Sequence, residues 1–185
     1  FMSYDEISLH KNHGYYSIGY SYFKKKDYPK AQIFFSKFNK RESFTEENKK
    51  LYLDNTQRLA DCYFINGEYK KAIGEYDFII KNNYNNSDYA LFQQGMLYGL
   101  QERHLDKIST LRKIQKDFSS SIYIDDALYQ MAMQHLIIED FRTAERIFNL
   151  IISQHDYSPF LPTSYLKMGL INYNQNKDDI ALRYY

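Results

Sequence analysis

The sequence has no tryptophan, one cysteine, three prolines and seven glycines among its 185 residues. The single cysteine, Cys62, excludes an internal disulfide. Scarce proline and glycine favour long helices over many tight turns. Seven dispersed glycines also cannot build a glycine-rich loop that holds phosphate.

An excess of one charge is absent too, because 24 basic side chains stand against 23 acidic ones. This balance gives no field that would attract nucleic acid, and the run Lys24-Lys25-Lys26 is typical of a solvated helix end. No stretch approaches the roughly 18 apolar residues that cross a bilayer. We therefore predict no nucleic-acid partner and no membrane insertion in this segment. Phe1 before Met2, and a last helix without a cap, indicate a fragment of a longer protein.

Catalytic and metal-binding patterns are also missing. Cys62 has no histidine near it in the sequence, which favours an inert buried thiol. His10 and His13 could share a helical face, but no further ligands follow at a suitable spacing. Helix starts explain Asp125-Asp126 and Asp178-Asp179 better than acid–base chemistry does. We predict no enzyme, no catalytic residue, no cofactor and no metal.

What the chain does have is 20 tyrosines, 13 phenylalanines and a repeated spacing. Tyrosine suits half-buried positions, which are common in a core only two helices thick. A small residue is followed three positions later by a mostly aromatic one, at Gly19/Tyr22, Ala60/Tyr63, Gly95/Tyr98, Ala132/His135 and Gly169/Asn172. Twelve positions beyond each small residue comes a second position, with a large residue four further on, at Ala31/Phe35, Ala72/Tyr76, Lys107/Leu111, Ala144/Phe148 and Ala181/Tyr185. Because antiparallel helices approach closely only where side chains are small, this spacing predicts paired helices that touch at these positions.

Short polar turns are expected inside each helix pair. Asn66-Gly67 can supply positive φ angles, and Asp27, Asp140 and Asp178 can cap the second helix of their pairs. Between pairs, Thr45 with two following glutamates predicts that the next helix begins a turn early. Three further linkers are polar stretches, and each begins with an aromatic residue whose ring we expect to pack between the helix pairs. These residues are Tyr84, Phe118 and Tyr157.

The pattern Gly19-x-x-Tyr22…Tyr28-x-x-Ala31-x-x-x-Phe35 resembles the tetratricopeptide signature, whose unit is about 34 residues. The resemblance implies an all-α fold, a right-handed α-α superhelix (solenoid) of about five helix–turn–helix repeats, the last one truncated. The expected repeats of this single array, 1–185, are 12–44, 45–86, 87–122, 123–160 and 161–185. Lys107, His135 and Asn172 depart from the family pattern. Long repeats with aromatic-plus-serine linkers also resemble a bacterial cell-envelope subgroup, although the compartment is left open.

In this family the first helices of successive repeats line a concave groove that holds partner peptides. Carried over by position, the groove residues are Tyr16, Tyr20, Phe23, Gln57, Asp61, Phe64, Tyr89, Phe92, Met96, Tyr129, Met133, Leu136, Leu166, Leu170 and Tyr173. Chaperone-binding members hold a peptide carboxylate with Lys and Asn where this chain has Tyr16, Tyr20 and Gln57, so capture of an acidic terminus is not expected. The alternative is that these rings pack on neighbouring helices.

Two functions from different classes follow from the resemblance. The first is a non-catalytic scaffold that binds a protein or peptide through an aromatic and apolar groove, in bacterial envelope assembly. Such binding should survive moderate salt, because aromatic burial drives it. The second is a module that binds a glycan or small ligand by stacking on the tyrosine-rich face. Self-association through the uncapped C-terminal end is a further expectation.

Overall fold

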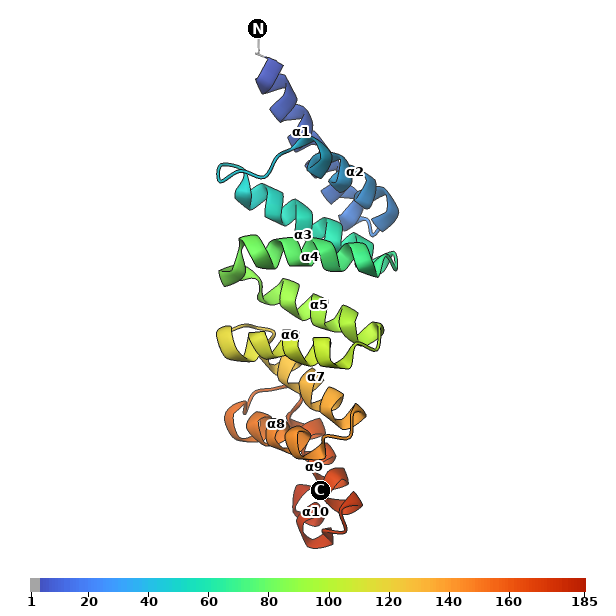
Figure 1. Ribbon diagram of the computed structural model, residues 1–185, viewed down its shortest axis with the longest axis vertical. Coiled ribbons are helices and arrows are strands. Elements are labelled where there is room, and N and C mark those ends of the chain that lie inside the picture. The colour runs from blue at the N-terminus through green and yellow to red at the C-terminus, as the bar shows by residue number, and fades with distance from the viewer. Residues whose placement is uncertain (1–3) are drawn as a thin grey trace. The chain divides into compact units, whose positions relative to one another are not determined.

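The computed structural model describes residues 4–185, with side chains from residue 13 onward. This part of the chain contains ten α-helices, one short 3₁₀ helix and no strand, so the predicted all-α fold of helix pairs is confirmed. The helices follow one another along the chain (Figure 1) as α1 (Tyr4–Lys24), α2 (Tyr28–Arg41), α3 (Lys49–Ile65), α4 (Tyr69–Asn82), η1 (Tyr84–Asn86), α5 (Asp88–Leu100), α6 (His104–Asp117), α7 (Ile124–Ile137), α8 (Phe141–Gln154), α9 (Leu161–Asn174) and α10 (Asp178–Tyr184). None of the described helices combines the length and the apolar character that a membrane span requires.

Two compact parts make up the chain, an N-terminal half, Phe1–Ala90, and a C-terminal half, Leu91–Tyr185. Each half is described by itself. Helices α1 to α4 form two pairs in the first half, and α6 to α10 with most of α5 belong to the second. The single array over 1–185, with the repeat boundaries given above, stays a prediction.

Small residues lie where the helices of a pair meet. A Cβ atom added to Gly19 would come within 2.8 Å of the Phe35 ring, and one added to Gly95 within 2.7 Å of the Leu111 side chain. The large residue of the second helix therefore covers the small residue of the first. Four small positions of the second helices are buried as well, at Ala31, Ala72, Ala144 and Ala181. The contact between helices at the predicted small positions is confirmed.

The third pair places a lysine where the others have alanine. Lys107 is buried, and its Nζ donates to Gln130 Oε1 on α7 at 2.9 Å. A Cβ atom added to Gly99 on α5 would lie 3.1 Å from Lys107 Cδ, so the lysine stem fills space that this glycine leaves. Burial lowers the pKa of the Lys107 ammonium. The third pair thus has glycine at position 99, where the other first helices carry a large residue, and lysine at position 107, where the other second helices carry alanine.

All five turns within pairs use one backbone motif. One residue in each turn has a positive φ, namely Lys26, Gly67, Glu102, Glu139 and Asn176. The amide of the following residue then bonds to the carbonyl five positions back, as Asp27 N does to Tyr22 O at 3.0 Å and Asp140 N to His135 O at 2.8 Å. This 6→1 bond satisfies a carbonyl at the end of the first helix. The positive φ predicted at Asn66-Gly67 falls on Gly67 alone.

Two of the three predicted helix caps are confirmed. Asp27 accepts from the Lys30 amide at the start of α2, and Asp140 accepts from the Thr143 amide at the start of α8. The prediction for Asp178 is wrong, because Lys177 holds the cap position and Asp178 is already the first residue of α10. The cap follows directly after the positive-φ residue of the turn, which in this pair is Asn176.

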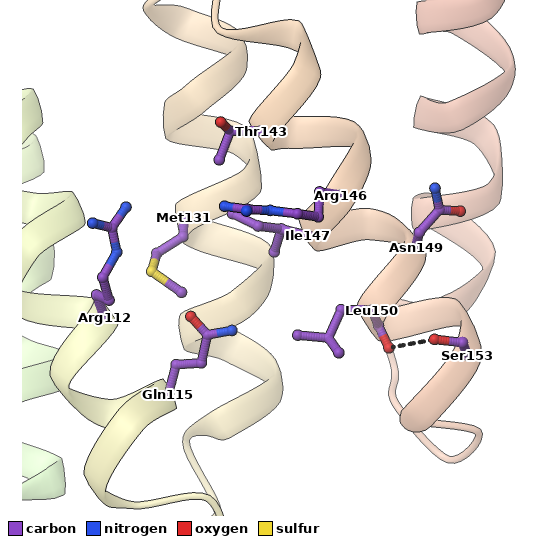
Figure 2. Close-up of a pocket in the computed structure, with 9 residues that line it drawn as sticks. All are labelled: Arg112, Gln115, Met131, Thr143, Arg146, Ile147, Asn149, Leu150 and Ser153. Carbon is purple, nitrogen blue, oxygen red and sulfur yellow. Dashed lines mark hydrogen bonds between the residues drawn. The ribbon is translucent and has the colours of Figure 1, made fainter.

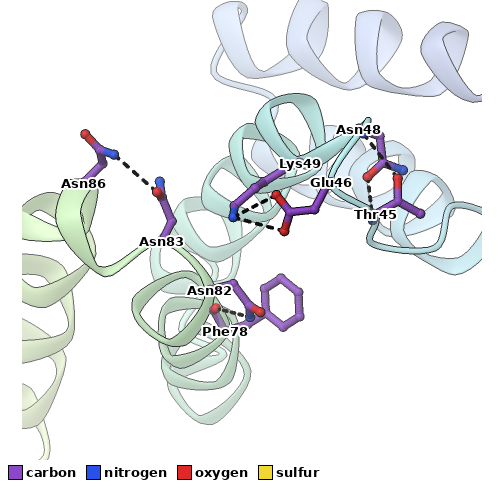
Figure 3. A network of polar contacts seen from close by, with 8 residues as sticks. All are labelled: Thr45, Glu46, Asn48, Lys49, Phe78, Asn82, Asn83 and Asn86. Atoms are coloured by element: carbon purple, nitrogen blue, oxygen red, sulfur yellow. Dashed lines mark hydrogen bonds and ion pairs between the residues drawn. The ribbon is translucent and has the colours of Figure 1, made fainter.

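Two predictions about linkers are corrected. Helix α3 begins at Lys49 rather than a turn earlier, since Thr45 and Asn48 close a turn with reciprocal bonds, Thr45 N to Asn48 Oδ1 at 2.9 Å and Asn48 N to Thr45 Oγ1 at 3.3 Å (Figure 3). Tyr157 is fully exposed, so its ring does not pack between the helix pairs. Phe160 packs in its place, because its ring stacks on Tyr129 with centroids 4.4 Å apart.

The two polar residues at aromatic positions have local partners. His135 Nδ1 lies 3.0 Å from Asp140 Oδ2, and Asn172 Nδ2 donates to Met168 O at 2.8 Å. Both side chains are buried. Hydrogen bonds within the pair therefore satisfy Asn172 Nδ2 and His135 Nδ1, while His135 Nε2 is buried without a hydrogen-bond partner among the described residues.

Candidate binding surface on the first helices

In the N-terminal half, the predicted groove rings pack on other rings. Tyr16 stacks on Tyr20 with centroids 6.0 Å apart and meets Phe38 edge-on at 6.3 Å. Phe23 contacts Tyr28 at 5.5 Å, again edge-on. These rings are half-buried, as are Gln57 and Phe64 on α3. Much of the aromatic surface that the sequence assigned to the groove in this half therefore covers neighbouring side chains.

Asp61, another predicted groove residue, is buried beneath two tyrosines. The hydroxyls of Tyr76 and Tyr89 both donate to its Oδ1, at 2.7 and 2.8 Å. Burial raises the pKa of the Asp61 carboxyl, while the two hydroxyl groups and the charge of Arg58 act in the opposite direction. Asp61 therefore holds helices α3, α4 and the start of α5 together.

Asp54 and Arg58 extend this polar cluster along the same face of α3. Arg58 lies 3.4 Å from Asp54 Oδ1 and 3.6 Å from Asp61 Oδ2, and its guanidinium stands over the Phe23 ring at 5.6 Å. Tyr16 donates to Asp54 Oδ2 at 2.6 Å. Neither Asp54 nor Arg58 was predicted to take part, although Arg58 stands about one helical turn before Asp61 and Asp54 about two turns before it.

In the C-terminal half, the first two sets of groove rings are again packed. Phe92 stacks on Tyr123 with centroids 5.4 Å apart, and Tyr129 is stacked on Phe160. Met96 and Met133 are half-buried on their helices. These four positions are therefore partly covered by neighbouring side chains.

Helix α9 presents the most exposed groove residues. Leu166, Leu170 and Tyr173 of α9 are exposed by 48%, 40% and 60%. Beside them lies a depression of about 370 Å³, lined by Leu136, Phe141, Lys167, Leu170, Ile171, Asn174 and Gln175. It brings together Leu136 of α7 and Leu170 of α9, two predicted groove residues from successive first helices.

The depression is apolar in its walls and polar at one side. Lys167 is the one charged residue among those that line it, and the Gln175 amide donates outward to Glu145 Oε1 at 3.2 Å. Phe141, which starts α8, was not predicted here, because it belongs to a second helix and only folding brings it next to α9. A pocket of this size and lining suits apolar side chains with a few polar groups beside them.

Cys62 is buried, as predicted, in a cluster with Ala31, Phe35 and Leu59. Burial raises the pKa of its thiol to about 12, which keeps the sulfur protonated and a poor nucleophile at neutral pH. The described residues hold no group of three His, Cys, Asp or Glu side chains that could bind a metal ion. The side chain of His10 lies outside that part of the chain.

No family model and no curated protein matches the chain. Solved structures do match. MamA of Desulfovibrio magneticus RS-1 is 13% identical with a TM-score of 0.72, over 94% of this chain and 90% of that one. A tetratricopeptide repeat protein of Parabacteroides merdae is 14% identical with a TM-score of 0.75, over 95% and 65%. PilF of Pseudomonas aeruginosa is 16% identical with a TM-score of 0.68, over 96% and 74%. The chain has the tetratricopeptide fold that its sequence predicted, and no catalytic family is indicated.

Proposed function

We propose that this chain with a tetratricopeptide fold is a non-catalytic scaffold, which binds a partner protein or peptide on the first helices of its C-terminal half. The observation that carries the proposal is the apolar depression between Leu136 and Leu170, continued by the exposed side chains of Leu166 and Tyr173. Contiguous exposed apolar surface on a folded protein commonly marks an interaction site.

The chemistry of the depression favours a partner that inserts an apolar side chain. Leu170 and Phe141 would contact that side chain, while the Asn174 amide lies at the depression and could bond to a peptide main chain; the Gln175 amide already bonds to Glu145 and Lys177. An amphipathic helix or an extended segment with regularly spaced apolar residues offers such a side chain. Burial of apolar area would supply most of the affinity, so the complex should tolerate moderate salt.

Ligand stacking on tyrosine faces is the less favoured function. The rings of Tyr16 and Tyr129 already stack on Tyr20 and Phe160, which leaves fewer free faces for a sugar. Tyr173 is exposed, but one ring offers little area. A glycan panel measured by thermal shift separates the two functions, because a peptide scaffold should show no shift with any glycan.

The proposal extends to assembly in the bacterial cell envelope. Its support is the long repeats with aromatic-plus-serine linkers, which the sequence shares with an envelope subgroup. Fractionation of the native host tests this part, and recovery of the protein with cytoplasmic contents alone would contradict it. Self-association through the end of α10 is a separate expectation, which sedimentation of the purified chain tests.

A photo-cross-linking side chain at Leu170 tests the binding surface in the native host. We expect it to join the full-length protein to a protein partner, and the same label at Tyr173 to give the same adduct. Leu105 on α6 provides the control, since it is exposed but lies on a second helix away from the depression. Phe141→Asp should abolish the adduct. Equal adducts from Leu105, or an adduct that survives Phe141→Asp, would disprove the assignment.

A further inference from the structure

A second cleft in the C-terminal half shares no residue with the apolar depression. It has a volume of about 390 Å³ and lies between α6 and α8, with Met131 of α7 at its floor (Figure 2). Its walls come from the second helices of two successive pairs. No groove prediction included any of its residues, because the family resemblance places partners on the first helices.

Two arginines stand on opposite walls of this cleft. Arg112 belongs to α6 and Arg146 to α8, and Figure 2 shows Arg146 extending across toward the α6 side. No acidic residue is among those that line the cleft. Within the part of the chain that the structure describes, neither guanidinium has an ion-pair partner, whereas Arg103 of the same half pairs with Asp106 at 2.7 Å.

The carboxylate nearest in sequence to Arg146 is committed elsewhere. Glu145 accepts from Gln175 of α9, on the other side of α8. The cleft therefore carries two positive charges that the chain itself does not neutralise. Arginine binds carboxylates in a planar, bidentate geometry, so two of them facing one space form a receptor for an anionic group.

The rest of the cleft suits a peptide better than a small anion. Ile147 and Leu150 add apolar surface beside the floor, which inorganic phosphate could not use. Gln115 offers an amide group from the α6 wall, and side-chain amides bond readily to a peptide main chain, whereas Asn149 Oδ1 accepts from the Tyr184 hydroxyl of α10 at 3.4 Å. The combination of apolar surface, amides and cations matches a segment in which an acidic side chain stands next to an apolar one.

We infer that the cleft between α6 and α8 is a second binding site, which takes such an acidic and apolar peptide segment. The carboxylate lies between Arg112 and Arg146, and the neighbouring apolar side chain lies on Ile147 and Leu150. This site does not depend on the apolar depression, so the two could hold different segments of one partner. Its binding should weaken with salt, in contrast to the depression, because charge supplies much of the attraction.

Fluorescence anisotropy with the full chain tests the site. The probe is a short labelled peptide of alternating glutamate and leucine, and the matched peptide carries glutamine in place of glutamate. We expect the glutamate peptide alone to bind, and Arg112→Gln and Arg146→Gln each to weaken it about tenfold, as loss of one charge-assisted hydrogen bond predicts. Arg146→Lys should recover part of the binding, because it keeps the charge without the planar geometry.

Matched controls lie on the same helices. Lys113 and Arg142 are exposed but do not line the cleft, so Lys113→Gln and Arg142→Gln should leave binding within about twofold. Phe141→Asp should leave it unchanged, which separates this site from the proposed scaffold surface. Equal losses from the control variants, equal binding of the glutamine peptide, or displacement by inorganic phosphate or phosphatidylglycerol vesicles at lower concentration than by unlabelled peptide would overturn the inference.

Discussion

Asp61 in the N-terminal half and Leu170 in the C-terminal half occupy the same position, directly after the first small residue of their pairs. Asp61 is buried and accepts two tyrosine hydroxyls, whereas the Leu170 side chain is exposed at a depression. The comparison teaches that one repeat position can hold the fold together in one place and remain free to bind in another. Repeat position alone therefore does not identify a binding residue.

The two halves differ in whether their groove side chains can form hydrogen bonds to a neighbouring helix. Tyrosines in the N-terminal half span the space between helices and end on a carboxylate, as Tyr16 does on Asp54. At the position of Tyr20 and Asp61, directly after the first small residue, the C-terminal half has Met96, Met133 and Leu170, which have no hydroxyl or carboxylate to form such a bond. Their contacts depend only on apolar area, so a partner protein can replace them.

The largest expected effect is on Asp61→Ala. It removes the acceptor of the Tyr76 and Tyr89 hydroxyls and leaves Arg58 with less compensation, so we expect a loss of about 2–4 kcal/mol in the free energy of unfolding. Urea unfolding of the full chain measures it. Leu170→Ala should cost less than about 1 kcal/mol, because that side chain is exposed. Equal losses at the two positions would end the distinction between the halves.

Overpacking of the pairs comes next and should affect both halves alike. Ala72 and Ala144 are fully buried at the second small position, so Ala72→Leu and Ala144→Leu should each cost about 1–3 kcal/mol. Gly74→Ala is the control, since no side chain lies near that exposed glycine of α4, and it should stabilise by about 0.5–1 kcal/mol. Unchanged melting of either leucine variant would contradict the helix contact described above.

Removal of a helix cap is a smaller change that sharpens the comparison. Asp27→Ala and Asp140→Ala should each cost about 1 kcal/mol, the usual loss for an N-cap. Asp140→Ala should lose more free energy of unfolding than Asp27→Ala, because the Asp140 carboxylate also contacts the buried His135. Thermal unfolding measures both, with Asp27→Asn and Asp140→Asn as variants that keep the cap. Asp27 has an exposed ion pair of its own, with Lys30 at 2.8 Å, and a loss at Asp140 no larger than that at Asp27 would contradict a contribution from the His135 contact beyond that of such an ion pair.

The smallest effect is on pH dependence, and it has opposite signs in the two halves. Burial raises the pKa of the Asp61 carboxyl, so the folded state binds a proton at a higher pH than the unfolded state does. The free energy of unfolding of wild type should therefore rise relative to that of Asp61→Asn as pH falls from the raised pKa to about 3.9, the ordinary pKa of aspartate in the unfolded chain. Hydrogen bonds to Thr143 lower the pKa of Asp140, so its contribution should be lost as pH falls through that lowered value. Urea unfolding of wild type and both asparagine variants over acidic pH tests the two signs.

The paired helices could be predicted because their signal is local. Gly19, Phe35 and the other contact residues recur at fixed spacing, and close approach requires them to be small or large. The Asp61 cluster could not, since its hydroxyl partners stand 15 and 28 residues away and any tyrosine could serve. Helix α3 was placed too early because its flanking Asn48 side chain closes a turn with Thr45, a choice that composition does not reveal. Which groove positions stay exposed depends on what packs over them.

Gly99 and Lys107 show how such a chain can change its sequence while it keeps its shape. In the other pairs a large side chain lies on the first helix, four positions after its first small residue, and alanine lies opposite on the second helix. Here Gly99 lies on the first helix and Lys107 on the second, so one long side chain still fills the space between the two helices. A larger residue at Gly99 would press on the Lys107 stem, and a small residue at position 107 would leave the space beside Gly99 unfilled. A helix pair can thus be packed by different residues, provided that the two facing positions match in size.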